Sequence, residues 1–146
     1  MGSIGNDSEI VEKVKQGTNG GLFELAVHGW NHTDYTKLNE EEQRNSLYNS
    51  NRKMFALFGT ASEIFIPPYN AFNDHTINAM KHVDMKILNA NKSSFDQLEL
   101  SDNNNESRTL SSSLMQSKEI FYIPATISFK DYYGGGICSK LSSKYF

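Results

Sequence analysis

The sequence predicts an α/β fold in which mostly parallel strands are joined by crossover helices. Short apolar runs alternate with amphipathic helical segments along the 146 residues, which is the pattern of successive strand–helix–strand units. The expected strands occupy residues 22–27, 63–66, 85–88 and 120–123. The expected helices occupy residues 7–16, residues 40–58 and a segment that starts near Asp74. Because the carboxyl ends of parallel strands meet at one rim, we expect function to gather where these strands end.

The first helix, over residues 7–16, has a polar cap and an apolar face. Asn6 or Asp7 can accept hydrogen bonds from the first turn, and Gly17 is expected to end the helix. The next run, residues 22–27, is short and mostly apolar, so it suits a buried strand. Beyond it the chain turns polar and aromatic without a helical period, which indicates a loop.

The clearest helix covers residues 40–58. Asn39 and Glu42 have the spacing of a capping box, and the acidic first turn suits the positive end of the helix dipole. Gly59 is expected to end the helix. Its apolar face is expected to hold Leu47, Met54, Leu57 and Phe58.

A second buried strand is expected over residues 63–66, and the following Pro67 ends it abruptly. A third helix then leads into the strand over residues 85–88. The residues that it turns inward are Ile77, Met80 and Val83. Residues 90–117 are rich in Asn and Ser and lack periodicity, so they predict a long surface loop. The last strand ends at Pro124.

Composition and charge exclude several classes of protein. The chain is long enough for one domain but too short for two. A net charge of -3 gives no basic surface for nucleic acid. No apolar run is long enough to span a membrane, and residues 1–7 lack the features of a secretion signal. Localisation stays open, because a missing amino-terminal segment could have held such a signal. The single cysteine, Cys138, excludes an internal disulfide framework and a cysteine-based zinc site.

Two histidines follow the first strand. His28 and His32 lie four residues apart in a loop, and such a pair can bind one metal ion. The structural alternative is that one histidine packs against Trp30 while the other forms a hydrogen bond in the loop. Asp34 is a weaker candidate for a third ligand. His75 and His82 fall on the third helix, where surface roles are expected.

A second candidate segment follows the second strand. Pro67 and Pro68 fix an extended path and bring Tyr69 and Asn70 to the rim. By itself this segment could be a strand end that happens to be aromatic. Asn73 could contact a ligand or cap the following helix.

Together, the sequences "ELAVHGWNH" and "FIPPYNAFND", separated by one amphipathic helix, resemble the polysaccharide deacetylase (NodB-homology) family of metal-dependent carbohydrate esterases. The first resembles the family's His-[Ser/Thr]-x-x-His motif, and the second resembles its Arg-x-Pro-Tyr motif. The resemblance implies a distorted (β/α) barrel with its site at the carboxyl ends of the strands. It also implies removal of acetyl groups from N-acetylated glycans by hydrolysis of the amide carbon–nitrogen bond.

Carried over to this chain, the resemblance implies that His28 and His32 bind a divalent metal, with zinc expected, while nickel, cobalt and iron stay open. It implies that the backbone N–H of Tyr69 stabilises the oxyanion. The groove residues that it implies are Trp30, Pro68, Tyr69 and Asn70. The expected partner is a carbohydrate, with no nucleic acid and no membrane span.

The chain departs from the family pattern at four places. It contains no Asp-Asp pair and no late Leu-His motif, Gly29 replaces Ser or Thr, and Phe65 or Ile66 stands in place of Arg. We therefore expect residues 1–146 to form a single incomplete deacetylase domain that lacks its first and last strands. Weak or no activity follows for this chain alone. The alternatives are a catalytically dead carbohydrate-binding relative and a different metal-dependent hydrolase on a related barrel.

Overall fold

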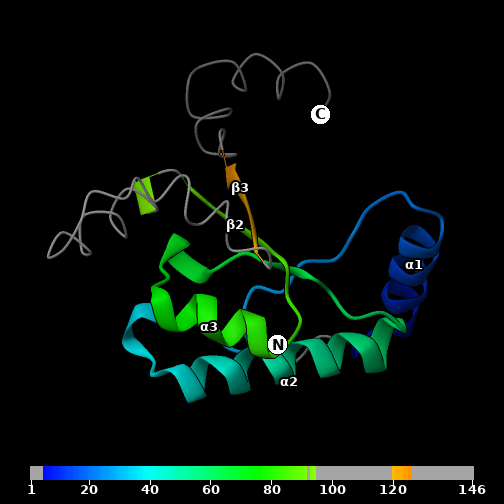
Figure 1. The fold of residues 1–146 in the computed structure, drawn as a ribbon. Coiled ribbons are helices and arrows are strands. Elements are labelled where there is room, and N and C mark those ends of the chain that lie inside the picture. Colours follow the sequence, from blue (N-terminus) through cyan, green and yellow to red (C-terminus); the bar gives the residue numbers. More distant parts are fainter. Residues whose placement is uncertain (1–4, 92, 95–119, 126–146) are drawn as a thin grey trace, which may run out of the picture.

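Three parallel strands form a sheet in the order β1 (Ile64–Phe65), β2 (Ile87–Asn91), β3 (Phe121–Ala125), as Figure 1 shows. This computed structural model describes residues 5–91, 93–94 and 120–125. A single parallel bridge between Val27 and Phe65 extends the sheet beyond β1. The predicted α/β class with parallel strands and crossover helices is confirmed, and the arrangement is consistent with part of a distorted (β/α) barrel.

Helices α2 (Glu40–Phe58) and α3 (Asp74–His82) pack against each other on the same side of the sheet (Figure 1). Each connects two parallel strands or bridge positions, as a crossover helix does. The apolar residues buried between these helices and the sheet are Val27, Leu47, Met54, Phe58, Phe65, Ile77, Met80 and Leu88. On the described part of the sheet, Phe121 and Ile123 of β3 remain exposed.

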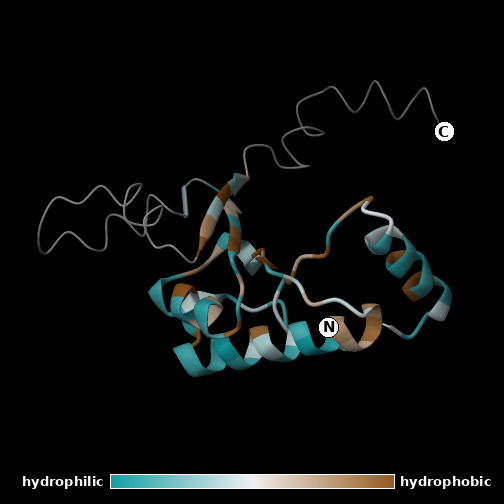
Figure 2. Ribbon diagram, turned by 45° about the vertical axis from the view of Figure 1, so that its right-hand side comes forward, coloured by the Kyte–Doolittle hydropathy of each residue, from teal (hydrophilic) through white to brown (hydrophobic). Residues whose placement is uncertain are grey.

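Helix α2 begins and ends where the sequence predicts. The Asn39 side chain accepts from the Glu42 N–H and the Glu42 carboxylate accepts from the Asn39 N–H, which satisfies two unpaired donors of the first turn. Gly59 ends the helix in the left-handed region, at φ 77°. Figure 2 shows that the hydrophilic first part of α2 gives way to a hydrophobic last turn, which lies toward helix α1 (Ser8–Asn19).

Helix α1 runs further than the sequence predicts. Asp7 caps it as expected, by accepting from the N–H groups of Glu9 and Ile10, but the helix continues through Gly17 to Asn19. The prediction that Gly17 ends the helix is wrong because this residue serves in close packing. A Cβ at Gly17 would come within 2.3 Å of the Phe23 ring.

The strand predicted over residues 22–27 is reduced to the bridge at Val27. Its N–H donates to Ile64 O at 2.8 Å, and its carbonyl accepts from Ile66 N–H at 2.9 Å. Leu22 and Phe23 are exposed, 80% and 46% respectively, so the expected burial of this run is wrong at its start. The apolar pattern predicted pairing, but within the described residues only Val27 has a neighbour in the sheet.

The remaining elements differ from prediction mainly at their boundaries. Strand β2 begins two residues later than expected and continues to Asn91, into the segment predicted as loop. The rest of that loop, apart from residues 93–94, lies outside the described residues, as does Cys138. No helix in the described part of the chain is both long and apolar enough to cross a membrane.

Candidate metal and ligand site

The two histidines lie together at the carboxyl end of the Val27 bridge. Their ring centroids are 5.0 Å apart, with an angle of 57° between the ring planes, and both side chains are exposed. The chain turns back between them at Gly29, whose φ of 83° favours glycine. The predicted proximity of the two imidazoles is therefore present in the fold.

The hydrogen bond of His28 defines its tautomer. Its Nδ1 lies 2.7 Å from the backbone oxygen of Ile66, which can only accept, so Nδ1 carries the hydrogen. In the neutral ring, Nε2 then has a free lone pair. A ligating histidine commonly donates its other ring N–H to a backbone carbonyl in this way, which orients the ring for metal binding.

The spacing of the rings fits two ligands of one ion. Two imidazoles bound to a tetrahedral zinc at Zn–N distances of about 2.0–2.1 Å have ring centroids about 5 Å apart. Among the described residues, however, no group of three or more His, Cys, Asp or Glu side chains could hold a metal. Asp34 does not join the pair; its carboxylate caps a short 3-10 helix, η1 (Tyr35–Lys37), through Thr36. This hydrogen bond from the Thr36 side chain lowers the pKa of Asp34.

The segment after β1 forms the second wall of the site. Pro67 and Pro68 lead into a short 3-10 turn, η2 (Pro68–Asn70), in which Tyr69 has φ 60° and Asn70 has φ 56°. Asn tolerates the left-handed region, but Tyr69 is strained there, and such strain gathers at functional sites. The turn brings the Tyr69 ring edge-on to His32, with centroids 4.5 Å apart.

The backbone of this turn presents an unused donor. The N–H groups of Asn70 and Ala71 donate to the carbonyls of Pro67 and Pro68. Within the part of the chain that the structure describes, the N–H of Tyr69 donates to no acceptor. The Tyr69 side chain is 67% exposed beside the histidines. The turn therefore offers both a backbone donor and an aromatic surface next to the imidazole pair.

The other predicted groove residues have different surroundings. Pro68 is fully buried, so its ring supports the backbone of the turn from the interior of the protein. The side-chain oxygen of Asn70, Oδ1, accepts from the N–H of Asn91, which ties the turn to the end of β2. Trp30 is half-buried and lies under Lys53, whose Nζ is 5.8 Å from the centroid of the indole. The structure thus brings Tyr69 to the histidine pair and places Trp30 against α2.

Two polar residues of α2, which the sequence analysis did not single out, form hydrogen bonds to the histidine loop (residues 28–35). The Ser46 hydroxyl accepts from the N–H of Trp30 at 3.0 Å and lies 2.7 Å from the Tyr35 hydroxyl. Burial raises the pKa of Tyr35, whose ring packs against Phe65. These contacts connect the middle of the loop to the core.

The second residue is Gln43, whose side chain is fully buried. Its Nε2 lies within hydrogen-bond distance of Tyr35 O, Leu38 O and Asn73 Oδ1, and its Oε1 accepts from Thr76 Oγ. One amide thus joins the loop after the histidines to the start of α3, which follows the Tyr69 turn. Asn73 caps α3 with Thr76, so its helix-cap role is confirmed.

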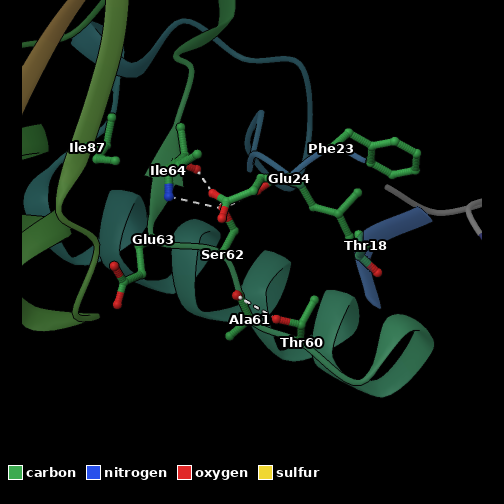
Figure 3. Close-up of a pocket in the computed structure, with 10 residues that line it drawn as sticks. Thr18, Phe23, Glu24, Thr60, Ala61, Ser62, Glu63, Ile64 and Ile87 are labelled. Atoms are coloured by element: carbon green, nitrogen blue, oxygen red, sulfur yellow. Dashed lines mark hydrogen bonds between the residues drawn. The ribbon is translucent and has the colours of Figure 1, made fainter. Parts of the chain in front are cut away.

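A hollow of about 310 Å³ lies at the opposite, amino end of the strands (Figure 3). Figure 3 shows Phe23 and Thr18 on one side of it and Ile64 and Ile87 on the other. The Ser62 hydroxyl at its floor is already hydrogen-bonded to Leu25 O and to the N–H of Ile64. No histidine lines the hollow, whereas the rim carries two imidazoles beside an exposed aromatic ring, so the rim is the better candidate site.

The two remaining histidines have surface positions, as predicted. His75 Nδ1 lies 3.4 Å from a carboxylate oxygen of Glu40, and His82 donates to the carbonyl of Asn78 in its own helix. The same Glu40 oxygen accepts from the Asn78 amide at 3.2 Å. Hydrogen bonds from Asn78 and His75 lower the pKa of Glu40. Both histidines belong to α3 and are exposed there.

Comparison with known families connects this geometry to one of them. A family model described as polysaccharide deacetylase matches residues 3–88, which is more than half of the chain and includes both rim segments. The chain belongs to the polysaccharide deacetylase family. The resemblance in the two motifs is thus confirmed at the level of the family, and deacetylases of this family act on carbohydrates. A comparison with curated proteins found no match.

Solved structures with similarity to this deacetylase-family chain include two from family CE4. The Xyl-CE4 domain of a multidomain xylanase, from the hindgut metagenome of Trinervitermes trinervoides, is 16% identical with a TM-score of 0.48. That alignment covers 82% of this chain and 69% of the other. A mutant of BA3943, a CE4 family pseudoenzyme, is 17% identical with a TM-score of 0.49. There the alignment covers 94% of this chain but only 49% of the other.

Proposed function

We propose that this chain carries part of the site of a metal-dependent deacetylase that hydrolyses the acetyl amide of N-acetylated sugars. His28 and His32 are the proposed ligands of a divalent ion, with zinc favoured. The observation that carries this proposal is the histidine pair itself. Its 5.0 Å ring separation suits a shared ion, and the bond from His28 Nδ1 to Ile66 O leaves Nε2 to bind it.

The residues of the chain have distinct proposed roles. When bound, a divalent ion lowers the pKa of a water molecule and polarises the amide carbonyl. The proposed role of the Tyr69 N–H is to donate to the oxygen on which negative charge develops. The exposed Tyr69 ring and the Nδ2 of Asn70 can contact the sugar, while Pro68 keeps the turn in its strained conformation. Trp30 can contribute its partly exposed indole to the wall.

Two groups that the proposed reaction needs are not found in the described part of the chain: a general base, and a further side chain to bind the metal. The sequence contains no Asp-Asp pair to give a general base and a further metal ligand. Within the described residues no His, Cys, Asp or Glu completes the histidine pair into a site of three. We therefore expect weak metal binding and little or no hydrolysis by this chain alone. The same observation favours the second candidate function, a carbohydrate-binding relative that has lost its chemistry.

Zinc titration by calorimetry tests the metal site. The chain is expected to bind one zinc saturably, and the His28→Ala/His32→Ala double variant is expected to bind none at that site. His75→Ala/His82→Ala is the matched control, because it removes two surface histidines of α3 and should leave zinc binding unchanged. Absence of zinc binding by the unsubstituted chain, or equal binding by both double variants, contradicts the metal site.

Incubation with chitin oligomers separates the two candidate functions. Acetate release that depends on added metal supports a deacetylase. Binding of the oligomers without acetate release, and without any effect of zinc, supports the carbohydrate-binding relative. A Tyr69→Ala variant is expected to weaken oligomer binding in either case, because the exposed ring is the proposed sugar contact.

A further inference from the structure

The histidine loop is anchored at three points. At its start, His28 is bonded to the Ile66 carbonyl at 2.7 Å. At its end, Tyr35 is fully buried and packs on Phe65, with ring centroids 4.9 Å apart. The middle anchor is the hydroxyl of Ser46 on α2, which accepts from the N–H of Trp30 at 3.0 Å.

The middle anchor controls the part of the loop that separates the two imidazoles. Trp30 lies halfway between His28 and His32 in sequence, and the turn at Gly29 beside it has a φ of 83°. A hydrogen bond to Ile66 holds His28, whereas the described residues form no side-chain hydrogen bond with the His32 ring, which contacts the rings of His28 and Tyr69. The separation of the two imidazoles therefore depends on these ring contacts and on the path of the backbone through Trp30.

The Ser46 hydroxyl joins this path to the core. Besides accepting from Trp30, it shares a 2.7 Å hydrogen bond with the Tyr35 hydroxyl, so one oxygen connects the middle of the loop to its buried end. Where the family pattern has Ser or Thr, this chain has Gly29, and the space for a side chain there is taken by Tyr35 at 3.0 Å. The loop thus has no hydroxyl of its own at that position, and α2 provides one.

We propose that Ser46 is a positioning residue that sets the separation of His28 and His32 and thereby the metal affinity of the pair. The inference rests on the proposed metal-binding function of these histidines. Ser46 does not contact the metal; it acts through the backbone of Trp30. Removing a residue that orients metal ligands typically weakens metal binding by about 10- to 100-fold. Because Ser46 acts one step further away, we expect a loss of about tenfold, near the lower limit.

Ser50 provides the matched control. It lies one turn further along α2, is fully buried and donates to the carbonyl of Ser46 at 2.7 Å. It has the same chemistry in the same helix, but its hydrogen bond stays within α2. Ser46→Ala and Ser50→Ala should both lower the melting temperature, whereas only Ser46→Ala should alter the site. Ser46→Thr keeps the hydroxyl and should preserve the site.

The first measurement uses the metal-free chain and NMR cross-relaxation between the ring protons of His28 and His32. A cross-peak is expected in the unsubstituted chain, in Ser50→Ala and in Ser46→Thr, and its intensity should fall at least about twofold in Ser46→Ala. An undiminished cross-peak in Ser46→Ala overturns the inference. Equal weakening in Ser50→Ala also overturns it, because the effect would then be general loosening of α2.

The second measurement is zinc affinity of the same four proteins, well below their melting temperatures. Ser46→Ala is expected to bind zinc about tenfold more weakly than the other three. Affinity within twofold of the unsubstituted chain overturns the proposed role. If the unsubstituted chain binds no zinc, the proposed metal function fails, while the cross-peaks still decide whether Ser46 positions the loop. The two failures are therefore distinguishable.

Discussion

The two ends of the sheet use polar residues in different ways. At the amino end, polar groups satisfy one another: Asn51 exchanges two hydrogen bonds with the backbone of Ser62, and Lys86 pairs with Glu63. At the carboxyl end, side chains form hydrogen bonds to backbone groups of the loops. The rings of His32 and Tyr69 contact one another and are exposed. These polar groups of the amino end are therefore already paired, whereas the rim leaves aromatic rings accessible to a ligand.

The difference favours position in the fold over the presence of a cavity as the guide to the proposed site. Ligand sites of parallel α/β folds lie beyond the carboxyl ends of the strands, where loops can carry side chains on a rigid support. Here the support consists of interior residues of α2, which form hydrogen bonds to both rim segments or to the residues that follow them. Disturbing that support should therefore cost more than disturbing the amino end.

The largest effect is expected from Gln43→Met, which retains most of the side-chain volume but removes the buried amide. Buried carbonyls of the histidine loop and the Thr76 hydroxyl would lose a partner, at a cost of about 2–4 kcal/mol of unfolding free energy. The measurement is urea unfolding of the variant and the parent. Asn45→Met, at an exposed position of the same helix, is the control and should change stability by less than about 0.5 kcal/mol. Similar losses in both variants would contradict a special role for the buried amide.

A pair of glycines compares the two ends directly. Gly29, at the rim, and Gly59, before β1, have similar φ values of 83° and 77°. A Cβ at Gly29 would lie 3.0 Å from the Tyr35 hydroxyl oxygen, whereas a Cβ at Gly59 would meet nothing within 4 Å. Gly59→Ala should cost about 1 kcal/mol from the left-handed backbone alone. Gly29→Ala should cost about 2 kcal/mol, because crowding adds to that strain. Equal costs in urea unfolding would mean that Tyr35 moves aside without penalty.

The sequence predicted those elements whose signals are local. Helix α2 begins after the Asn39 cap and ends before Gly59 as expected, because both ends depend on residues within one turn. The predicted closeness of the histidine loop and the Tyr69 turn is likewise present, since it follows from strand ends sharing one rim. Gly17 was misread because its role depends on Phe23, which the chain brings back against α1 only in the folded state.

The support beneath the site was not predicted because it consists of polar residues on a helix. Gln43 and Ser46 resemble an ordinary solvated face when they are taken alone. One signal could have revealed Gln43: with Ser50 it continues the spacing of Leu47 and Met54, so it lies on the buried face of α2. Which partners such a residue finds depends on loops far away in sequence, and periodicity carries no information about them.

The smallest predicted effect is a pH dependence at Tyr35, a buried residue whose hydroxyl is hydrogen-bonded to Ser46 of α2. Burial raises the pKa of Tyr35, so the folded chain holds its proton at a pH where the unfolded chain, with a pKa of about 10, releases it. The stabilisation from the neutral hydroxyl is fully present below that unfolded pKa and is lost as the pH rises through the folded pKa.

Tyr35→Phe removes the titrating group together with its hydrogen bond to Ser46. At pH 8 the variant should be less stable by about 1 kcal/mol. Above about pH 10 the parent should lose stability relative to the variant, because its folded state holds the Tyr35 proton longer than its unfolded state does, so the gap narrows. Exposed Tyr48 and Tyr69 remain in both proteins and cancel in the comparison. Urea unfolding of both proteins across this range measures the gap, and a constant gap would mean that the Tyr35 hydroxyl reaches solvent in the folded chain.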